Sequence, residues 1–148
     1  MATQGSLGAI YSISAGEPAT YNSAGFVALT FTEVGEVATL GDFGATFEDV
    51  TFVPLKTGIT EHRKGGVDYG ELSMSIAYDE ADAGQILIKS GVDGANRDVI
   101  YSHKIELTGG EIFYFTGQFF SAPYSIADAS SMVTQSVTVK LTNQTIDG

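Results

Sequence analysis

The clearest pattern in the sequence is an alternation of apolar and polar side chains near its middle. Over residues 71–78, Leu72 and Met74 begin a series in which every second side chain is large and apolar. A period of two is typical of a strand with one buried face, so we predict a strand here. Residues 133–142 repeat the alternation and predict a second strand, rich in Val and Thr. A shorter alternation predicts an earlier strand over 27–31.

Residues 99–108 and 111–120 predict a hairpin. The Gly-Gly pair at 109–110 lies between the two apolar segments, and tight primed turns favour this dipeptide. On the second arm Phe115 and Phe119 point the same way as Phe113. Such an aromatic face belongs in a core or in a contact between subunits.

One segment carries the signals of a helix. Asp79 can cap its N-terminus, Lys89 lies in its last turn, and Gly91 can close its C-terminus. These signals predict a helix over about residues 80–90.

Together these elements predict a mainly β fold. Six or more strands with one helix favour two packed antiparallel sheets, as a sandwich or barrel, with the helix on the flank. The chain has 148 residues and shows no long linker and no internal repeat, so we expect one domain over 1–148. A chain of this length can bury roughly two-thirds of its surface.

Composition narrows the classes of function. With 43% hydrophobic and 17% charged residues, the chain is expected to fold. Its net charge of −11 favours solubility and disfavours binding to nucleic acid or to anionic membranes. There is no Cys, which excludes disulfides, zinc–thiolate sites and Cys nucleophiles. The first residues predict no signal peptide, and no apolar run approaches the ~20 residues of a membrane span.

The charge is unevenly distributed. Residues 54–67 hold three of the seven basic residues and one acid, so this segment carries +2 and the remainder −13. Pro54 and three glycines predict a long loop or a loose hairpin here. It could be a solvated loop or a weak nucleic-acid patch, although aromatic side chains are absent from it. The third alternative is an arm that docks on an identical, acidic neighbour.

Sequence signals for catalysis are missing. His62 and His103 are the only histidines, and no GxSxG elbow, P-loop, HExxH or strand-linked GxGxxG occurs. Asp93, Asn96 and Asp98 do not have the spacing of a calcium-binding EF-hand loop. We therefore predict no catalytic residues, no metal site and no cofactor.

The order of the segments carries a family resemblance. TEVGEV at 32–37 is followed by EDVT at 48–51, then DYGELSMS at 68–75 and YDEADAGQ at 78–85. Over residues 26–142 this order resembles the major tail-tube protein of long-tailed phages and of phage-derived gene transfer agents. The tube protein of type VI secretion is similar in fold.

The resemblance implies a structural role and no enzymatic one. Such proteins form hexameric rings that stack into a tube, and the tube carries DNA from the capsid into the host. Strands of neighbouring subunits line an acidic lumen, and loops and terminal segments join one ring to the next. The expected partners are other copies of the chain, the tail tip or baseplate, the tape measure and the tail terminator. The expected location is the virion tail, assembled in the bacterial cytoplasm, without membrane binding by this chain.

Two sets of residues are predicted to serve assembly. The inter-subunit loop set is Lys56, Thr57, Gly58, His62, Arg63 and Lys64. The lumen-facing set is Glu71, Ser73, Ser75 and Glu48, chosen because the face of the 71–78 strand is small, acidic and free of Lys and Arg. Lys140 makes the outer face of 134–142 a poorer lumen candidate.

Two other functions remain open from the sequence. One is a carbohydrate-binding or host-adhesion sandwich, which the absence of Trp disfavours and the seven Tyr leave open. The other is a related ring protein, such as a tail terminator or a type VI secretion tube subunit.

Overall fold

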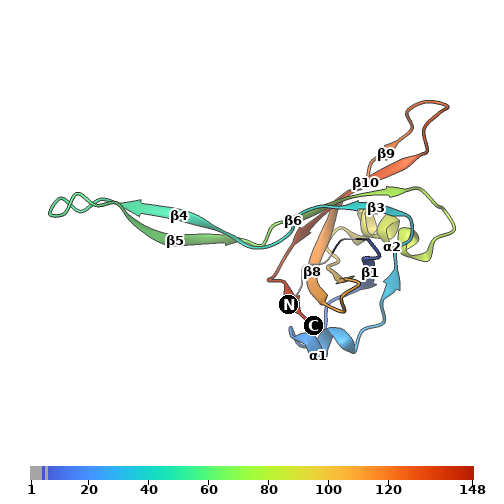
Figure 1. Ribbon diagram of the computed structural model, residues 1–148. Helices are drawn as coiled ribbons and strands as arrows, with labels where there is room; N and C mark the ends of the chain where they lie inside the picture. The colour runs from blue at the N-terminus through green and yellow to red at the C-terminus, as the bar shows by residue number, and fades with distance from the viewer. Residues whose placement is uncertain (1–4, 6) are drawn as a thin grey trace.

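The computed structural model describes residue 5 and residues 7–148 (Figure 1). The strands are β1 (Ile10–Ala15), β2 (Thr32–Glu33), β3 (Val37–Leu40), β4 (Thr46–Phe52), β5 (Glu61–Asp68), β6 (Glu71–Ala77), β7 (Tyr101–Glu106), β8 (Ile112–Ser121), β9 (Tyr124–Ser125), β10 (Thr134–Leu141) and β11 (Ile146–Asp147). The helices are α1 (Ser23–Val27), α2 (Ala83–Gly91) and the 3₁₀ turn η1 (Gly94–Asn96).

The body of the molecule is one nine-stranded antiparallel sheet. Its strand order is β2-β1-β7-β8-β10-β6-β3, with β11 added to β8 and β9 added to β10. Side chains from β1 and β7 share a single core cluster with side chains from β6 and β10. The sheet therefore curls until its two halves pack face to face, and the predicted mainly β class with a flanking helix is confirmed.

The strands predicted from a period of two are present. In β6, Leu72, Met74 and Ile76 are buried while Glu71 and Ser73 are exposed. Residues 101–121 form the predicted hairpin of β7 and β8, and Phe115 lies fully in the core. The hydrophobic pattern identified these strands because each has one face against the core.

The helix begins later than the sequence predicts. Its N-cap is Asp82, whose carboxylate accepts hydrogen bonds from the backbone N–H groups of Gln85 and Gly35 at 3.0 and 3.1 Å. Buried Gln85 in turn accepts from the N–H of Asp79 at 2.9 Å and donates to the carbonyl of Ala77 at 2.9 Å. These bonds hold residues 79–82 in a turn, so α2 starts at Ala83 and not near residue 80.

The early strand predicted over 27–31 is wrong. Asn22 caps the short helix α1 instead, accepting from the N–H of Gly25 at 2.8 Å. Phe26 is fully buried against Tyr114, and Val27 is 67% exposed. The alternation over residues 27–31 therefore does not correspond to a buried face. The buried side chain is Phe26, which precedes the alternating residues.

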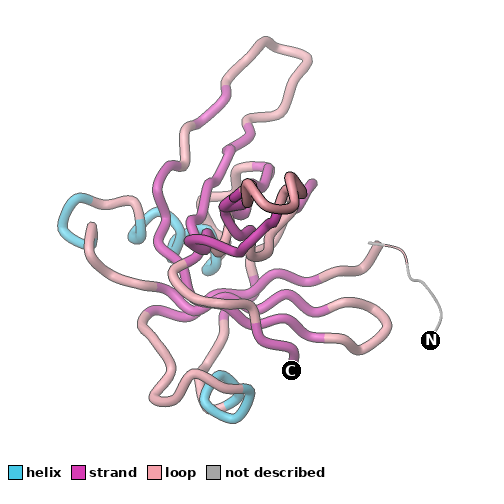
Figure 2. The backbone as a smooth tube through the Cα atoms, turned by 90° about the vertical axis from the view of Figure 1, so that its left-hand side faces the viewer, coloured by secondary structure: helices cyan, strands magenta, loops and turns pink. Residues whose placement is uncertain are grey.

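β4 and β5 form a separate two-stranded sheet that projects from the body, and we call residues 46–68 the arm (Figure 1). The arm continues the β3–β6 pair outward, and Figure 2 views the molecule nearly along it. The sequence predicts either a long loop or a loose hairpin over residues 54–67. Residues 61–67 belong to β5, so the hairpin is the better description. Only residues 53–60 lie outside the two strands.

Candidate assembly surfaces

The arm is exposed along nearly its whole length. All seven residues of β4 are exposed, and seven of the eight in β5 are exposed as well. At about 3.4 Å per residue, β4 alone reaches about 24 Å. A two-stranded ribbon without a covering layer is marginally stable in water. The arm therefore has the form of a segment that another chain covers.

Each face of the arm combines apolar and charged side chains. On one face Lys64 lies 4.7 Å from the centre of the Phe47 ring, and His62 contacts both carboxylate oxygens of Asp49 at 3.0 Å. On the other face Phe52 is 63% exposed and pairs across the ribbon with Glu61. A mixture of this kind is typical of protein–protein contacts, where apolar centres are bordered by charge.

The predicted inter-subunit set divides between the tip and one strand of the arm. Lys56, Thr57 and Gly58 lie in the turn at the tip, where the N–H of Gly58 donates to the carbonyl of Pro54 at 2.8 Å. His62, Arg63 and Lys64 follow one another in β5. The structure thus places all six on the arm, with the tip residues farthest from the body (Figure 1).

The tip is also the most apolar part of the arm. Leu55 is fully exposed, and Val53 and Ile59 are each more than half exposed. The salt bridges among residue 5 and residues 7–148 join His62 to Asp49 and Lys104 to Glu106, so Lys56 has no ion-pair partner in this part of the chain. Exposed apolar side chains beside an unpaired cation indicate a contact with another molecule.

The predicted lumen-facing residues are only partly brought together. Glu71, Ser73 and Ser75 share the outer face of β6, where the first two are exposed. Glu48 lies on β4 in the arm, a separate sheet, so it does not join their surface.

The ranking of β6 above β10 as a lumen face also needs correction. Lys140 of β10 is directly opposite Glu71 in the antiparallel pair, and Thr138 is opposite Ser73. Side chains opposite one another in a sheet point to the same side, so β6 and β10 present one surface and cannot be ranked separately. The sequence missed this because it does not give the strand register. Lys140 also lies 4.8 Å from the centre of the Phe120 ring.

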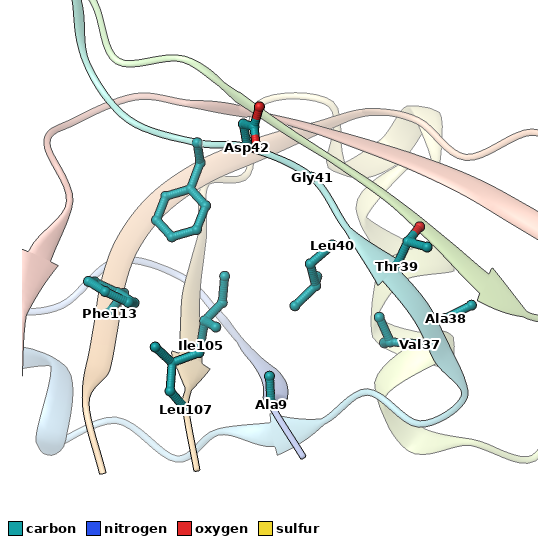
Figure 3. A pocket seen from close by; sticks show the side chains of 11 residues that line it. Ala9, Val37, Ala38, Thr39, Leu40, Gly41, Asp42, Ile105, Leu107 and Phe113 are labelled. Carbon is teal, nitrogen blue, oxygen red and sulfur yellow. The ribbon is translucent and has the colours of Figure 1, made fainter. Parts of the chain in front are cut away.

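A groove of about 520 Å³ opens between β3 and the β7–β8 hairpin (Figure 3). Leu40 points across it toward Ile105 and Leu107, and Phe113 closes one side. β3 is the last strand of the sheet, so one of its edges has no strand partner among residue 5 and residues 7–148. Asp42 is the only titratable side chain in the lining, which offers no acid–base pair for catalysis.

His103 is part of the core. It is fully buried and stacks on Phe115, with ring centres 4.9 Å apart. Its Nδ1 lies 2.6 Å from the hydroxyl of Tyr11 and its Nε2 lies 3.2 Å from the carbonyl of Gly117. Burial lowers the pKa of His103 to about 4 and raises that of Tyr11. The imidazole is therefore neutral, with Nε2–H donating to Gly117 and Nδ1 accepting from Tyr11.

The described residues hold no cluster of metal-binding type and no helix of membrane-spanning length. Within residue 5 and residues 7–148, no three His, Asp or Glu side chains come together as a metal site. No helix in the same residues has the length and hydropathy to span a bilayer.

Comparison with known proteins gives relatives in structure alone. No protein-family model matches the sequence, and no curated protein matches it. A chain from the PVC extracellular contractile injection system, in the structure of its sheath/tube terminator in the extended state, is similar with a TM-score of 0.66. The two are 10% identical, and the match covers 93% of this chain and 92% of that one.

Two further structures are similar in the same way. A chain of the PVC sheath–tube complex in the extended state matches with a TM-score of 0.60 at 9% identity, over 93% of this chain and 87% of that one. A chain of the six-fold symmetrised baseplate of the anti-feeding prophage (AFP) matches with a TM-score of 0.63 at 9% identity, over 97% and 95%. At such low identity the matches establish the fold, and this chain has the fold of subunits found in contractile injection systems.

Proposed function

We propose that this chain is a structural subunit of a phage-type tail, and that it forms hexameric rings stacked into a tube through which DNA passes. The observation that carries the proposal is the exposed arm, with its apolar and basic tip, on a packed β body. A two-stranded ribbon is marginally stable until another layer covers it, and the next ring of a stack would provide that layer.

The fold supplies a second element of support. β3 leaves one edge of the body sheet open, and the groove beside it is apolar. Pairing this edge with the sheet of a neighbouring copy would extend the sheet around a ring and remove the edge. A closed ring is thus a way for the body to satisfy the backbone groups that a monomer leaves to water.

The outer face of β6 and β10 is the proposed lumen wall. Glu71 and Lys140 are opposite charges in one pair, and the neighbouring pairs Ser73–Thr138 and Ser75–Ser136 are small and uncharged. DNA binds where cations cluster, and one Lys beside one Glu forms no such cluster. The wall would therefore be non-adhesive because it is small and nearly neutral. A map of the tube that shows Glu71 on the outer surface would refute this assignment.

The proposal is tested by deleting residues 57–66, which removes the second half of the tip and six of the eight residues of β5. Purified protein is imaged by negative stain over a range of concentrations. We expect tubes from the intact chain, and monomers or single rings from the deletion. Circular dichroism and thermal unfolding provide the control, because the body should remain folded. Full-length tubes of normal stability from the deletion, or no assembly of the intact chain, would overturn the proposal.

A tail terminator is the second candidate. It is favoured by the similarity to the structure of a sheath/tube terminator, which has the highest TM-score of the three comparisons. A terminator ends a stack, so the purified chain would form single rings at every concentration. The same images therefore separate the two candidates.

A further inference from the structure

The arm and helix α2 lie at opposite ends of the body (Figure 1). Between α2 and the β9–β10 segment is a hollow of about 290 Å³, which we call the helix-end hollow. Its lining includes Tyr78, Asp79, Glu80, Ile86, Lys89 and Tyr124.

The helix-end hollow presents apolar surface to solvent. Ile86 is 54% exposed on the outer face of α2, and the rings of Tyr78 and Tyr124 pack edge to face at 5.2 Å on the rim. In the loop between β9 and β10, Ile126 and Met132 are both more than three-quarters exposed. Large apolar side chains grouped around a hollow mark a contact surface, because single exposed ones would be scattered.

The charge of this surface complements the tip of the arm. Asp79 and Glu80 are exposed at the hollow, and neither takes part in the ion pairs of residue 5 and residues 7–148. At the tip, Lys56 stands between the exposed Leu55 and Ile59. The tip therefore offers apolar side chains and a cation. The hollow offers apolar walls, two carboxylates and one cation, Lys89, so its formal charge is −1.

We infer that the tip of the arm of one copy docks in the helix-end hollow of the next copy, with Leu55 against Ile86 and Lys56 against Asp79 and Glu80. The inference rests on the proposed stacking and names the surface that receives the arm. A contact between opposite ends of identical subunits is head-to-tail, and it repeats from subunit to subunit without closing on a pair. That symmetry builds an open stack when the rotation between copies does not close into a ring.

The apolar groove beside β3 is the less suitable receptor for the tip. It adjoins the root of the arm, since residues 41–43 line it just before β4 begins. The groove therefore lies at the same end of the body as the arm. A tip reaching the next copy would arrive at the opposite end, where α2 lies. The groove also holds a single acid, Asp42. It fits the lateral contact between neighbours in one ring better.

The absence of Cys from the chain allows a direct test by cross-linking. Two single-cysteine variants, Leu55→Cys and Ile86→Cys, are mixed, assembled and oxidised. A disulfide needs the two Cα atoms within about 7 Å, so a cross-linked dimer reports the contact itself. We expect this dimer from the mixture and not from either variant alone. The control replaces Ile86→Cys by Ser136→Cys, an exposed position on the sheet face.

A charge swap supplies the second measurement. Lys56→Glu and Glu80→Lys should each raise the protein concentration needed for assembly by about two- to fivefold, the range of an exposed ion pair. The double variant should return to the concentration of the unaltered chain. Glu17→Lys makes the same change of charge in the segment between β1 and α1, outside the tip and outside the lining of the hollow, and should leave assembly unchanged.

The outcomes separate this inference from the proposed function. If deletion of residues 57–66 abolishes tubes while Leu55→Cys cross-links to Ser136→Cys as readily as to Ile86→Cys, the docking site is wrong and the tube stands. The same holds if the double charge variant assembles no better than the single ones. If the intact chain never assembles, both are overturned.

Discussion

The pairs β3–β6 and β4–β5 are successive parts of the same two chain segments, yet their surroundings differ. In β6 every second residue is buried, whereas β4 is exposed at all seven positions. β4 nevertheless carries large apolar side chains, Phe47, Val50 and Phe52. A series of apolar side chains therefore predicts that a face is covered. It does not predict whether the cover comes from the same chain or from another one.

The two regions should contribute differently to stability. The body encloses a continuous cluster of buried side chains, whereas the arm packs only against itself. Burial of apolar area contributes about 25 cal/mol per Å², so an exposed ribbon adds little to folding. The arm should instead contribute to association, where its apolar surface is removed from water.

The largest expected effect compares one phenylalanine from each region. Phe115→Ala empties a fully buried position in β8 and should cost about 3–5 kcal/mol in the free energy of unfolding. Phe52→Ala removes an exposed ring from the arm and should change that free energy by no more than about 0.5 kcal/mol. Urea unfolding of both variants at low protein concentration measures the difference.

Phe52 should matter for assembly although it matters little for the free energy of unfolding. Phe52→Ala should weaken tube formation although its fold is intact. If Phe52→Ala unfolds as readily as Phe115→Ala, the arm belongs to the cooperative unit of folding, and the division into body and arm fails.

The sequence predicted the body well where one face of a strand meets the core. The periods of β6 and β10 and the Gly-Gly turn between β7 and β8 were readable because each depends on local rules. β1 was not predicted, although Tyr11 and Ile13 alternate with Ser12 and Ser14, because the series is short. In the fold both of its faces are covered, since four successive residues are buried. The helix boundary was misplaced because Gln85 makes contacts with distant backbone groups that no local rule contains.

The candidate surfaces were less predictable than the fold. The charge of residues 54–67 distinguished this segment from the acidic remainder of the chain. Its shape depends on the pairing of β4 with β5, which the sequence does not give. The two glycines within β5 favoured the prediction of a loop. The lumen face was incomplete because Lys140 and Glu71 become neighbours only through the register of β10 on β6. The helix-end hollow joins residues near 80 to residues near 124, and no local pattern connects them.

The next largest effect concerns pH and the body alone. An unfolded histidine titrates near 6.5, whereas His103 in the fold has a pKa of about 4. Between these values the unfolded chain binds a proton that the folded chain does not. This contribution to stability is therefore complete above pH 6.5 and is lost as the pH falls toward 4, by about 3 kcal/mol in total.

The control for this pH effect is His103→Gln, which keeps polar atoms near Tyr11 and Gly117 and cannot take up the proton. Carboxylates titrate in the same range, so the test is the difference between the two proteins in unfolding free energy measured from pH 7 to pH 4. The variant should lose less stability on acidification than the unaltered chain. Parallel curves would contradict the assignment of the effect to His103.

The smallest effect lies at the junction of the two regions. Gly70 joins β5 to β6 with a φ of +93°, and a Cβ there would collide with the backbone carbonyl of Gly44 on the facing segment. Gly58 at the tip also has a positive φ, +65°, but its Cβ would meet no atom within 4 Å. Gly70→Ala should therefore cost about 1–3 kcal/mol, from backbone strain together with the collision.

Gly58→Ala isolates the strain, because it shares the left-handed backbone without the collision, and it should cost about 1 kcal/mol. Thermal unfolding of the two variants gives the comparison, and tube formation shows its consequence. If the collision turns the arm away from its docking position, Gly70→Ala assembles poorly even at temperatures where its body is folded. Equal losses of stability and equal assembly in the two variants would mean that the backbone around Gly70 and Gly44 shifts at little cost in free energy. The direction of the arm would then be set by the neighbour that receives it and not by the chain itself.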